Sequence, residues 1–409
     1  MLLQNNRLLE IRNAVFTAMV VVYLAAIHVS PSIASIASIL LIVNSVWFFF
    51  ETKKSKQLII TQALFLGVFL FSIVLSMIHG CHFNELTAKI LVRLPLAFLP
   101  SLVSYVQVNK LSFSKYWLVF SLPIFWLSLA SVFNYIDHYA FLSQMVLESK
   151  PIPIYSGVYH IEFSVITAIL LLILIGWKME DKIPKIMGTH IFFYFVFGGL
   201  FIALHVLSAR TGLLGFWSGI LLMNFQQGKK ISLKYILIGI VALSSMFFVP
   251  SIQNRIINTY EDLTAVAQNK DLNHKSFGQR WEAWKAIVHA GGETPFFGIG
   301  QCNIEWKMQQ SFDELKSNLD AENRISPHNQ YLQWFIEIGI VGMLMWIICY
   351  SVFLIWMRRT GVSKQLWSVV MALIFSMNFE SLMERQSGVM IIIVSLLLIS
   401  SMKLEKTLN

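Results

Sequence analysis

The feature that most constrains this sequence is a succession of apolar runs, each about as long as a membrane-spanning helix. A bilayer core about 30 Å thick is crossed by about 20 apolar residues in an α-helix. We predict twelve spans, near residues 14–29, 32–50, 58–78, 88–108, 115–135, 160–177, 187–207, 211–226, 232–250, 328–357, 365–383 and 386–402. The predicted fold class is all-α, a polytopic membrane protein with a long, partly helical outer loop.

The composition agrees with a chain whose main solvent is lipid. Hydrophobic residues make up 56% of the sequence and charged residues 13%, whereas soluble domains carry about 25% charged residues. The net charge of +9 comes from short clusters between the apolar runs. Since no nucleic-acid motif accompanies them, nucleic acid is not a predicted partner. No convincing cleavage site follows the first apolar run, which we interpret as an uncleaved span.

The basic residues of the connecting loops predict the topology. One alternating set of short loops, with the two ends, holds eighteen Lys and Arg, and the other set holds five. Basic residues favour the cytoplasmic side, so both termini are predicted to be cytoplasmic. We expect three parts: spans one to nine in residues 1–250, an outward-facing loop at 251–327, and spans ten to twelve in 328–409.

Two arginines on the predicted outer side run against this charge rule. Arg210 lies in S-A-R-T-G, at a turn between spans, and Arg280 lies in F-G-Q-R-W-E-A-W. Around Arg280, one apolar helical stripe comprises Phe277, Trp281, Trp284 and Val288. A Trp-rich helix of this kind is typical of the headgroup layer, where Arg280 would meet a lipid pyrophosphate. The alternative is that both arginines only reach to lipid headgroups.

A histidine near the start of span ten is a candidate general base. Ser326 is a suitable N-cap and Pro327 suits the first helical position, so we expect His328 and Asn329 in the first turn. The positive end of the helix dipole attracts anions and keeps imidazole neutral. A neutral imidazole can accept a proton. The alternative is a capping or interfacial histidine.

Further polar residues on the predicted outer side are candidates for substrate binding. They are Asn329, Arg385, Gln386, Arg93, Lys89 and Trp284. Near two of them, Glu380 and Glu384 could pair with the cluster or hold a sugar. The H-G-C-H run at 79–82 is an incomplete metal site, and no metal is predicted. Cys81 and Cys302 both lie in predicted outer loops, and the sequence does not decide whether they pair.

Three of these motifs together resemble a known family. The H-N-x9-G-x-x-G pattern runs from His328 to Gly342, and S-A-R-T-G precedes it. Between them stands Q-R-W-E-A-W-K-A-I-V-H-A-G-G-E-T-P-F-F-G-I-G, which contains Arg280. This order of arginine, arginine and histidine resembles the O-antigen ligase and polymerase family, and most of all its ligases. The first 200 residues match it only in hydropathy.

The resemblance implies transfer of a glycan from undecaprenyl pyrophosphate to an acceptor hydroxyl, without a cofactor, nucleotide sugar or metal. It implies a site at the periplasmic face of the bacterial inner membrane, with Arg210 and Arg280 on the pyrophosphate and His328 on the acceptor. The expected acceptor is lipid A core. The alternatives are a growing glycan, as in O-antigen polymerases, or a protein, as in O-oligosaccharyltransferases. A transporter of lipid-linked glycans is an alternative from another class; it would bind without turnover.

Overall fold

The computed structural model describes residues 2–26, 28, 30–51, 55–184, 189–226, 249–268 and 270–402. Every regular element in these ranges is a helix, which confirms the all-α prediction. The first half comprises α1 (Leu2–Ala26), α2 (Pro31–Glu51), α3 (Lys56–Ile78), α4 (Phe83–Ala97), α5 (Leu99–Val108), η1 (Ser114–Tyr116), α6 (Trp117–Asp137), α7 (Tyr139–Leu147), α8 (His160–Met179) and α9 (Thr189–Val206). The second half comprises α10 (Arg210–Gln226), α12 (Pro250–Ala267), α13 (Ser276–Gly292), α14 (Ile304–Glu314), η2 (Ala321–Asn323), α15 (Gln330–Arg359), α16 (Leu366–Met377), η3 (Leu382–Glu384) and α17 (Gln386–Ser400).

Several helices are long and apolar enough to cross a bilayer, so the chain is a multi-pass membrane protein. In the described ranges seven meet this measure, and they are Arg7–Ala26, Pro31–Glu51, Lys56–Ile78, Phe83–Val108, Ser114–Asp137, His160–Met179 and Gln330–Arg359. Three shorter apolar helices are His190–Val206, Leu366–Met377 and Gln386–Ser400. The predicted total of twelve spans stays a prediction.

Two predicted spans need comment. The span predicted at 88–108 is not one straight helix, because α4 ends at Ala97 and α5 starts at Leu99. Pro95 and Pro100 flank this break, and proline lacks the N–H that a continuous helix needs. The span predicted at 232–250 lies, except for its last two residues, outside the described residues. The basic clusters at 53–54, 229–234 and 403–406, and Lys185, also lie outside them.

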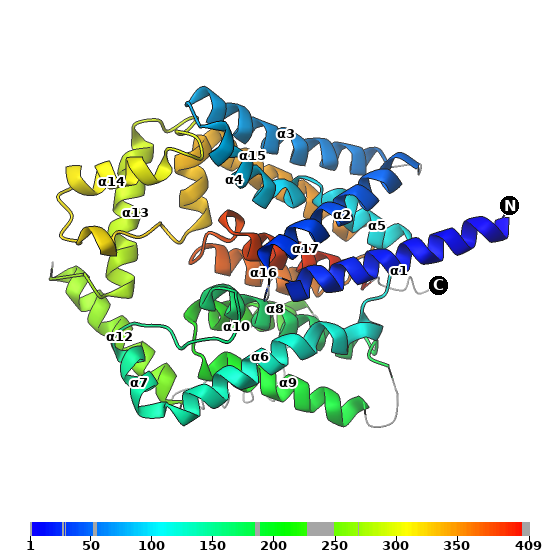
Figure 1. Cartoon of the computed structure of the whole chain (residues 1–409), viewed down its shortest axis with the longest axis horizontal. Coiled ribbons are helices and arrows are strands. Elements are labelled where there is room, and N and C mark those ends of the chain that lie inside the picture. The colour runs from blue at the N-terminus through cyan, green and yellow to red at the C-terminus, as the bar shows by residue number, and fades with distance from the viewer. Residues whose placement is uncertain are drawn as a thin grey trace.

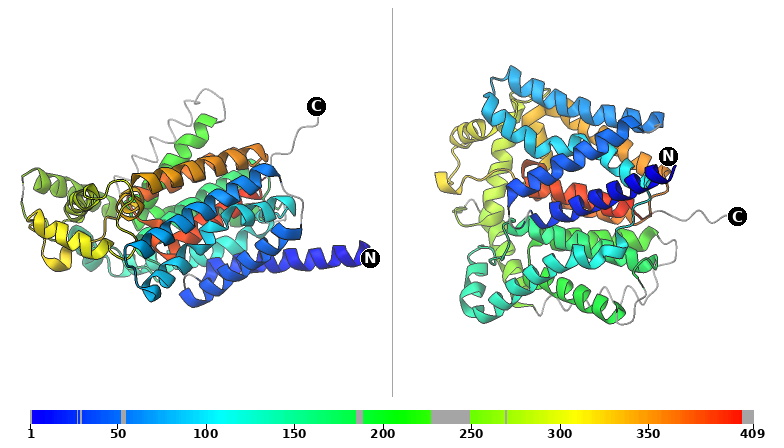
Figure 2. Two further views of the ribbon diagram at one scale, coloured as in Figure 1. Left: turned by 90° about the horizontal axis from the view of Figure 1, so that it is seen from above. Right: turned by 45° about the vertical axis from the view of Figure 1, so that its right-hand side comes forward.

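The helices form a bundle with a cap at one end. Figure 1 shows most of them running roughly along the long axis of the molecule, while α7, α12, α13 and α14 gather at one end. There α12 and α13 run across the direction of the bundle, and the start of α1 lies at the opposite end. Both views of Figure 2 keep α13 and α14 at that same end. We call these four helices the cap.

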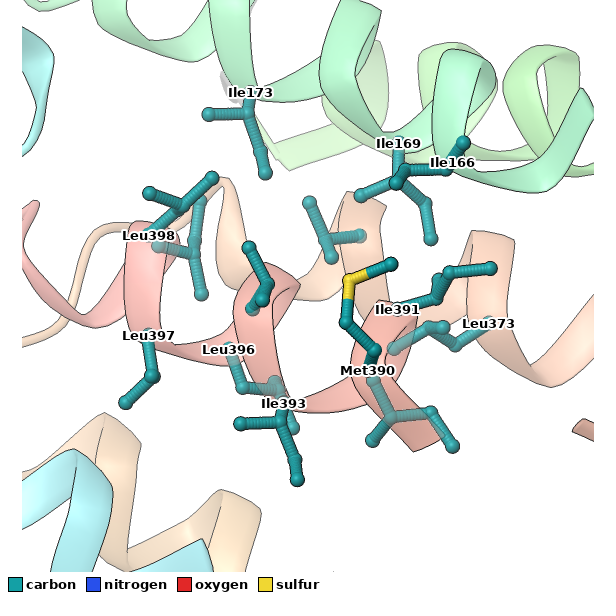
Figure 3. Packing of buried hydrophobic residues seen from close by; sticks show 14 of the residues in the cluster. Ile166, Ile169, Ile173, Leu373, Met390, Ile391, Ile393, Leu396, Leu397 and Leu398 are labelled. Carbon is teal, nitrogen blue, oxygen red and sulfur yellow. The ribbon is translucent and has the colours of Figure 1, made fainter. Parts of the chain in front are cut away.

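The centre of the bundle is a largely apolar contact between α8 and α17. Their buried faces meet through isoleucine, leucine and methionine side chains, such as Ile169 and Ile173 of α8 and Met390 of α17 (Figure 3). Helix α10 packs beside α8 so closely that a Cβ on Gly212 would lie 2.6 Å from the backbone of Ser164. The glycine of S-A-R-T-G therefore lets α10 start against α8, which fixes Arg210 at the capped end.

The longest helix, α15, is interrupted by the loop that precedes α14. Gly339 has φ 65° and ψ −174°, so the helical path breaks there. The N–H of Ile340 donates to the C=O of Pro295 (2.8 Å), and the N–H of Gly300 donates to the C=O of Glu337 (2.9 Å). A Cβ on Gly339 would lie 2.2 Å from the backbone of Phe296. Glycine is needed here both for the positive φ and for the close approach.

A disulfide adds a second link between bundle and cap. Cys81, just beyond α3, pairs with Cys302, just before α14, and their Cα atoms are 5.4 Å apart. The sequence left this pairing undecided. Because the two cysteines are 221 residues apart in sequence, only the folded chain brings them together. The link and the interrupted α15 together hold the cap against the bundle.

Candidate active site between the bundle and the cap

Helix α13 carries Arg280 and is held firmly within the cap. The N–H of Phe277 in its first turn donates to the carboxylate of Asp262 on α12 (2.8 Å). Its small side chains Ala283 and Ala286 are fully buried in a cluster shared with α14. The position of Arg280 along the cap is therefore fixed by neighbours on two helices.

The predicted apolar stripe of α13 divides into two parts. Trp281 is 40% exposed and Val288 is 52% exposed, whereas Trp284 is turned toward the start of α15. The indole N–H of Trp284 donates to the C=O of Pro327 (2.8 Å). Trp284, predicted to bind substrate, thus contacts the segment that leads into His328.

The predicted N-cap of span ten, Ser326, is wrong by three residues. Helix α15 begins at Gln330, and its N-cap is Asn329, whose side-chain oxygen accepts from the N–H groups of Tyr331 and Leu332. Asn caps a helix as well as Ser does, so the local pattern offered two equivalent starts. His328 therefore precedes the helix, with φ 45°. The argument that the helix dipole keeps its imidazole neutral no longer applies.

A carboxylate orients His328 in place of the helix dipole. Nδ1 of His328 lies 3.0 Å from Oε2 of Glu380, which follows α16. An ionised carboxylate only accepts, so Nδ1 donates and Nε2 is left as the proton acceptor. Burial raises the pKa of Glu380, but the His328 hydrogen bond and the charges of Arg385 and Arg280 lower it below its usual value.

Three arginines converge on the same region from three helices. Arg210 is the first residue of α10, Arg255 lies on α12 and Arg280 lies on α13. A guanidinium nitrogen of Arg210 donates to the C=O of Arg255 (3.3 Å), and one of Arg255 donates to the C=O of Lys150 (2.9 Å). In the described ranges none of the three forms an ion pair with a carboxylate. Asp262 and Glu380 act on Arg210 and Arg280 only from farther away.

The electrostatics of the cap arginines reflect this lack of partners. Burial and, to a smaller extent, the charge of Arg210 together lower the pKa of Arg255 to about 10. Burial also lowers the pKa of Arg280, against the opposing effect of Glu380. Three half-buried cations held close together favour an added anion. The arrangement can bind a phosphate or pyrophosphate group.

Tyr159 and the first turn of α8 complete this side of the site. The guanidinium of Arg385, a predicted substrate-binding residue, stacks on the ring of Tyr159 with 4.6 Å to its centroid. Its Nε lies 4.0 Å from Glu162. Several charged groups act on the imidazole of His160, and they are Arg255, Glu380, Arg280 and His328. The arginine cluster and the His328–Glu380 pair therefore form one site.

Arg93 and Lys89 on α4 lie in a different environment. The Arg93 guanidinium donates to both carboxylate oxygens of Glu337 (2.5 and 2.8 Å) and also pairs with Glu384. The Lys89 ammonium donates to the C=O of Gln301. Arg93 is 5% exposed, so its charge is already neutralised inside the protein.

Asn329 and Gln386, the remaining predicted residues, make hydrogen bonds within the fold. The amide of Asn329 donates to the C=O of Asn378 (3.0 Å), in addition to its capping role. The amide of Gln386 donates to the hydroxyl of Ser35 on α2 (2.8 Å). Both residues hold the segments around the site in place.

A possible cation site lies in the cap. In the described part of the chain, the group with ligand atoms close enough to hold a metal is His289, Glu293 and Glu314, all exposed. Lys307 pairs with Glu293, and His289 lies 3.6 Å from Glu314. Side chains that pair on the surface in this way are common without a metal, and we assign them no role in the site.

Comparison with known proteins supplies a family. A family model described as O-antigen ligase matches residues 193–347. The chain carries an O-antigen ligase domain. The matched stretch contains Arg210, Arg255, Arg280 and His328, whereas Glu380 lies beyond it. The predicted resemblance to the O-antigen ligase family is thereby confirmed for residues 193–347.

A related protein adds little about function. An uncharacterized protein of Haemophilus influenzae is 27% identical over 167 residues, which are 37% of this chain and 41% of the relative. The match thus spans about two fifths of that relative's length.

Three members of the site were missed or left without a role in the sequence. Arg255 lies in the long outer segment, which was left out of the loop charge count, and no motif surrounds it. Tyr159 meets Arg385 only in the fold. Glu380 was seen as part of a charged cluster, but its partner His328 is 52 residues away. The one available signal for Arg255 was its place as a basic residue within an amphipathic stretch of the outer segment.

Proposed function

We propose that this O-antigen ligase domain protein transfers a glycan from undecaprenyl pyrophosphate to a hydroxyl of lipid A core. The observation that carries the proposal is the half-buried trio Arg210, Arg255 and Arg280, without carboxylate partners in the described ranges, beside the His328–Glu380 pair. An anion site next to an oriented base is what transfer from a glycosyl pyrophosphate requires. Family membership supports the reaction class.

The arginines bind the donor in this proposal. Guanidinium groups form charge-assisted and often bidentate hydrogen bonds with phosphate oxygens. Arg210 and Arg280 take the pyrophosphate, and Arg255 adds a third positive charge from α12. As the bond from the anomeric carbon to the pyrophosphate breaks, its electron pair passes to the pyrophosphate oxygen. The same three cations stabilise that growing negative charge.

His328 activates the acceptor. The proton of the acceptor hydroxyl passes to Nε2 of His328 while the hydroxyl oxygen bonds to the anomeric carbon. Glu380 holds Nδ1–H and stabilises the imidazolium that forms. The positive φ of His328 places its ring outside the helix that follows. A pyrophosphate leaving group needs no general acid, so one base suffices.

The proposed location is the bacterial inner membrane with the cap in the periplasm. The loop charges support this orientation, since one alternating set of short loops with the two ends holds eighteen Lys and Arg and the other set holds five. A cysteine introduced at Asn273, a half-buried residue in the loop between α12 and α13, should react with a membrane-impermeant thiol reagent in intact spheroplasts. Labelling of a cysteine at position 230 in its place would reverse the orientation.

Deletion of the gene followed by lipopolysaccharide gels tests the proposal. Loss of all O-antigen from the core, with lipid-linked O-antigen accumulating, is the expected result. A single repeat unit left on the core would identify a polymerase, and a loss confined to glycosylated proteins would identify an O-oligosaccharyltransferase. Unchanged glycans on core and proteins would refute glycan transfer.

A further inference from the structure

A cavity adjoins the site on the side of Glu380 that faces away from the arginine trio. It has a volume of about 390 Å³ and lies between α14, residues 324–327 and the turn that contains Glu380 and η3. Sites for small molecules usually enclose about 300–1,000 Å³. The cavity is therefore large enough for a sugar, and the arginine trio does not line it.

Two buried polar side chains line this cavity without partners. The hydroxyl of Ser381 is buried and makes no hydrogen bond within the described residues. The side-chain amide of Gln333 makes none there either, although Gln333 is only 7% exposed. Buried polar groups in folded proteins are nearly always hydrogen-bonded. Ser381 and Gln333 therefore offer their hydrogen-bonding groups to something that enters the cavity.

The charges around the cavity favour a neutral, polar occupant. Three basic side chains line it, and so do three acidic ones. Four of these six are already paired: Arg324 with Asp313, Glu384 with Arg93, Glu380 with His328, and Arg385 with Glu162. Met308 and Phe312 add an apolar wall. Mixed amide, hydroxyl and apolar surfaces suit the hydroxyls and C–H faces of a sugar ring.

We propose that this cavity binds the terminal sugar of the acceptor, a neutral and hydroxyl-rich residue. The inference rests on the proposed function, and it assigns donor and acceptor to different sides of one residue pair. Pro327 lines the cavity directly before His328, and Glu380 lines it while holding the His328 ring. A sugar in the cavity thus lies against Pro327 and Glu380, the two neighbours of His328, and the donor pyrophosphate lies on the arginine side.

Steady-state kinetics with purified full-length protein in nanodiscs test this assignment. The substrates are undecaprenyl-pyrophosphate-linked O-antigen and lipopolysaccharide that lacks O-antigen. Ser381→Ala and Gln333→Leu should each raise KM for the lipopolysaccharide about 5–10-fold, the usual effect of one lost hydrogen bond. KM for the donor should not change. Gln310→Leu, on α14 but outside the cavity lining, is the matched control and should behave as wild type.

The thermal stability of the variants separates binding from a purely structural role. Ser381→Ala removes a hydroxyl that has no partner in the described fold, so its melting temperature should stay the same or rise. An unchanged acceptor KM in both variants, with an active wild type, would overturn the cavity assignment alone. Absence of transfer by the wild type would refute the proposed function and this inference with it.

Discussion

Arg93 and the arginine trio differ in one respect. The protein supplies a counter-charge to Arg93 and supplies none to the trio among the described residues. Arg93 is buried with two carboxylates, those of Glu337 and Glu384. Arg210, Arg255 and Arg280 have no carboxylate partner among the described residues. A buried cation is costly unless it is paired. The difference indicates that Arg93 holds α4 to α15, whereas the half-buried trio is available for the anion that we propose it binds.

The largest expected effect is the loss of turnover when His328, the proposed base beside the trio, is replaced. Asn tolerates a positive φ, so His328→Asn should keep the backbone conformation. It lacks a basic nitrogen, and transfer should fall about 10²–10⁴-fold, while donor affinity stays near that of wild type. Single-turnover rates and donor binding measure this, with His274→Asn on an exposed part of the cap as control. An active His328→Asn protein would leave His328 a positioning role only.

Replacement by methionine should have opposite effects on stability at Arg93 and at Arg280. Arg93→Met leaves two carboxylates without their cation, and breaking a buried pair costs about 3–5 kcal/mol. Arg280→Met removes a cation that has no ion pair, so stability should be unchanged or higher. Thermal unfolding of both proteins in detergent gives the comparison. Equal losses would show that the trio is paired in the folded protein and would remove the distinction.

The lowered pKa of Arg255 predicts how the stability of the protein changes when this arginine is replaced. Its pKa is lowered on folding, from 12.5 to about 10, by burial and then by Arg210. A base with a lowered pKa destabilises the fold at every pH below about 10, and this cost fades only as the pH rises toward the unfolded value. Arg255→Met should therefore raise stability at pH 7, but by no more than about 1 kcal/mol. Arg255 is only half-buried, so water screens part of the cost of its charge, and the variant also loses the hydrogen bond to Lys150.

The same variant should bind the donor more weakly, so stability and binding move in opposite directions. Arg12→Met is a useful contrast, since Arg12 pairs with Glu51 at the far end of the bundle. It should leave donor binding unchanged. A less stable Arg255→Met protein with normal donor affinity would contradict a binding role for Arg255.

The smallest expected effect is that of removing divalent metals. If the guanidinium groups supply the positive charge for the leaving pyrophosphate, transfer by purified protein should survive EDTA within about twofold. A collapse that magnesium or manganese restores would show that the trio does not suffice.

The sequence predicted the helices well because the length and hydropathy of a span are local properties. Eleven predicted spans coincide with helices, and the break between α4 and α5 could have been read from Pro95 and Pro100. The site was harder. Asn329 and Ser326 are equivalent caps on paper, and only the positive φ of His328 decides between them.

Contacts between distant segments explain the remaining differences. Whether an arginine is paired cannot be read from its neighbours in sequence, as Arg93 and Glu337 show, because they are 244 residues apart. The cysteine pair and the His328–Glu380 contact are also contacts between residues far apart in sequence. The family motifs identified Arg210, Arg280 and His328, but no local pattern distinguished Arg255, which meets them only through α12.

The affinity of Arg280→Lys for the donor tests the central claim most directly. Lysine keeps the charge but loses the planar group that can hold two oxygens. Binding of undecaprenyl-pyrophosphate-linked glycan to protein in nanodiscs should weaken about tenfold or more, an effect equivalent to about 1.4 kcal/mol, with the melting temperature unchanged. Arg12→Lys, with its partner Glu51 far from the cap, should bind as wild type. Wild-type donor affinity in Arg280→Lys would contradict the claim that the unpaired arginines hold the pyrophosphate.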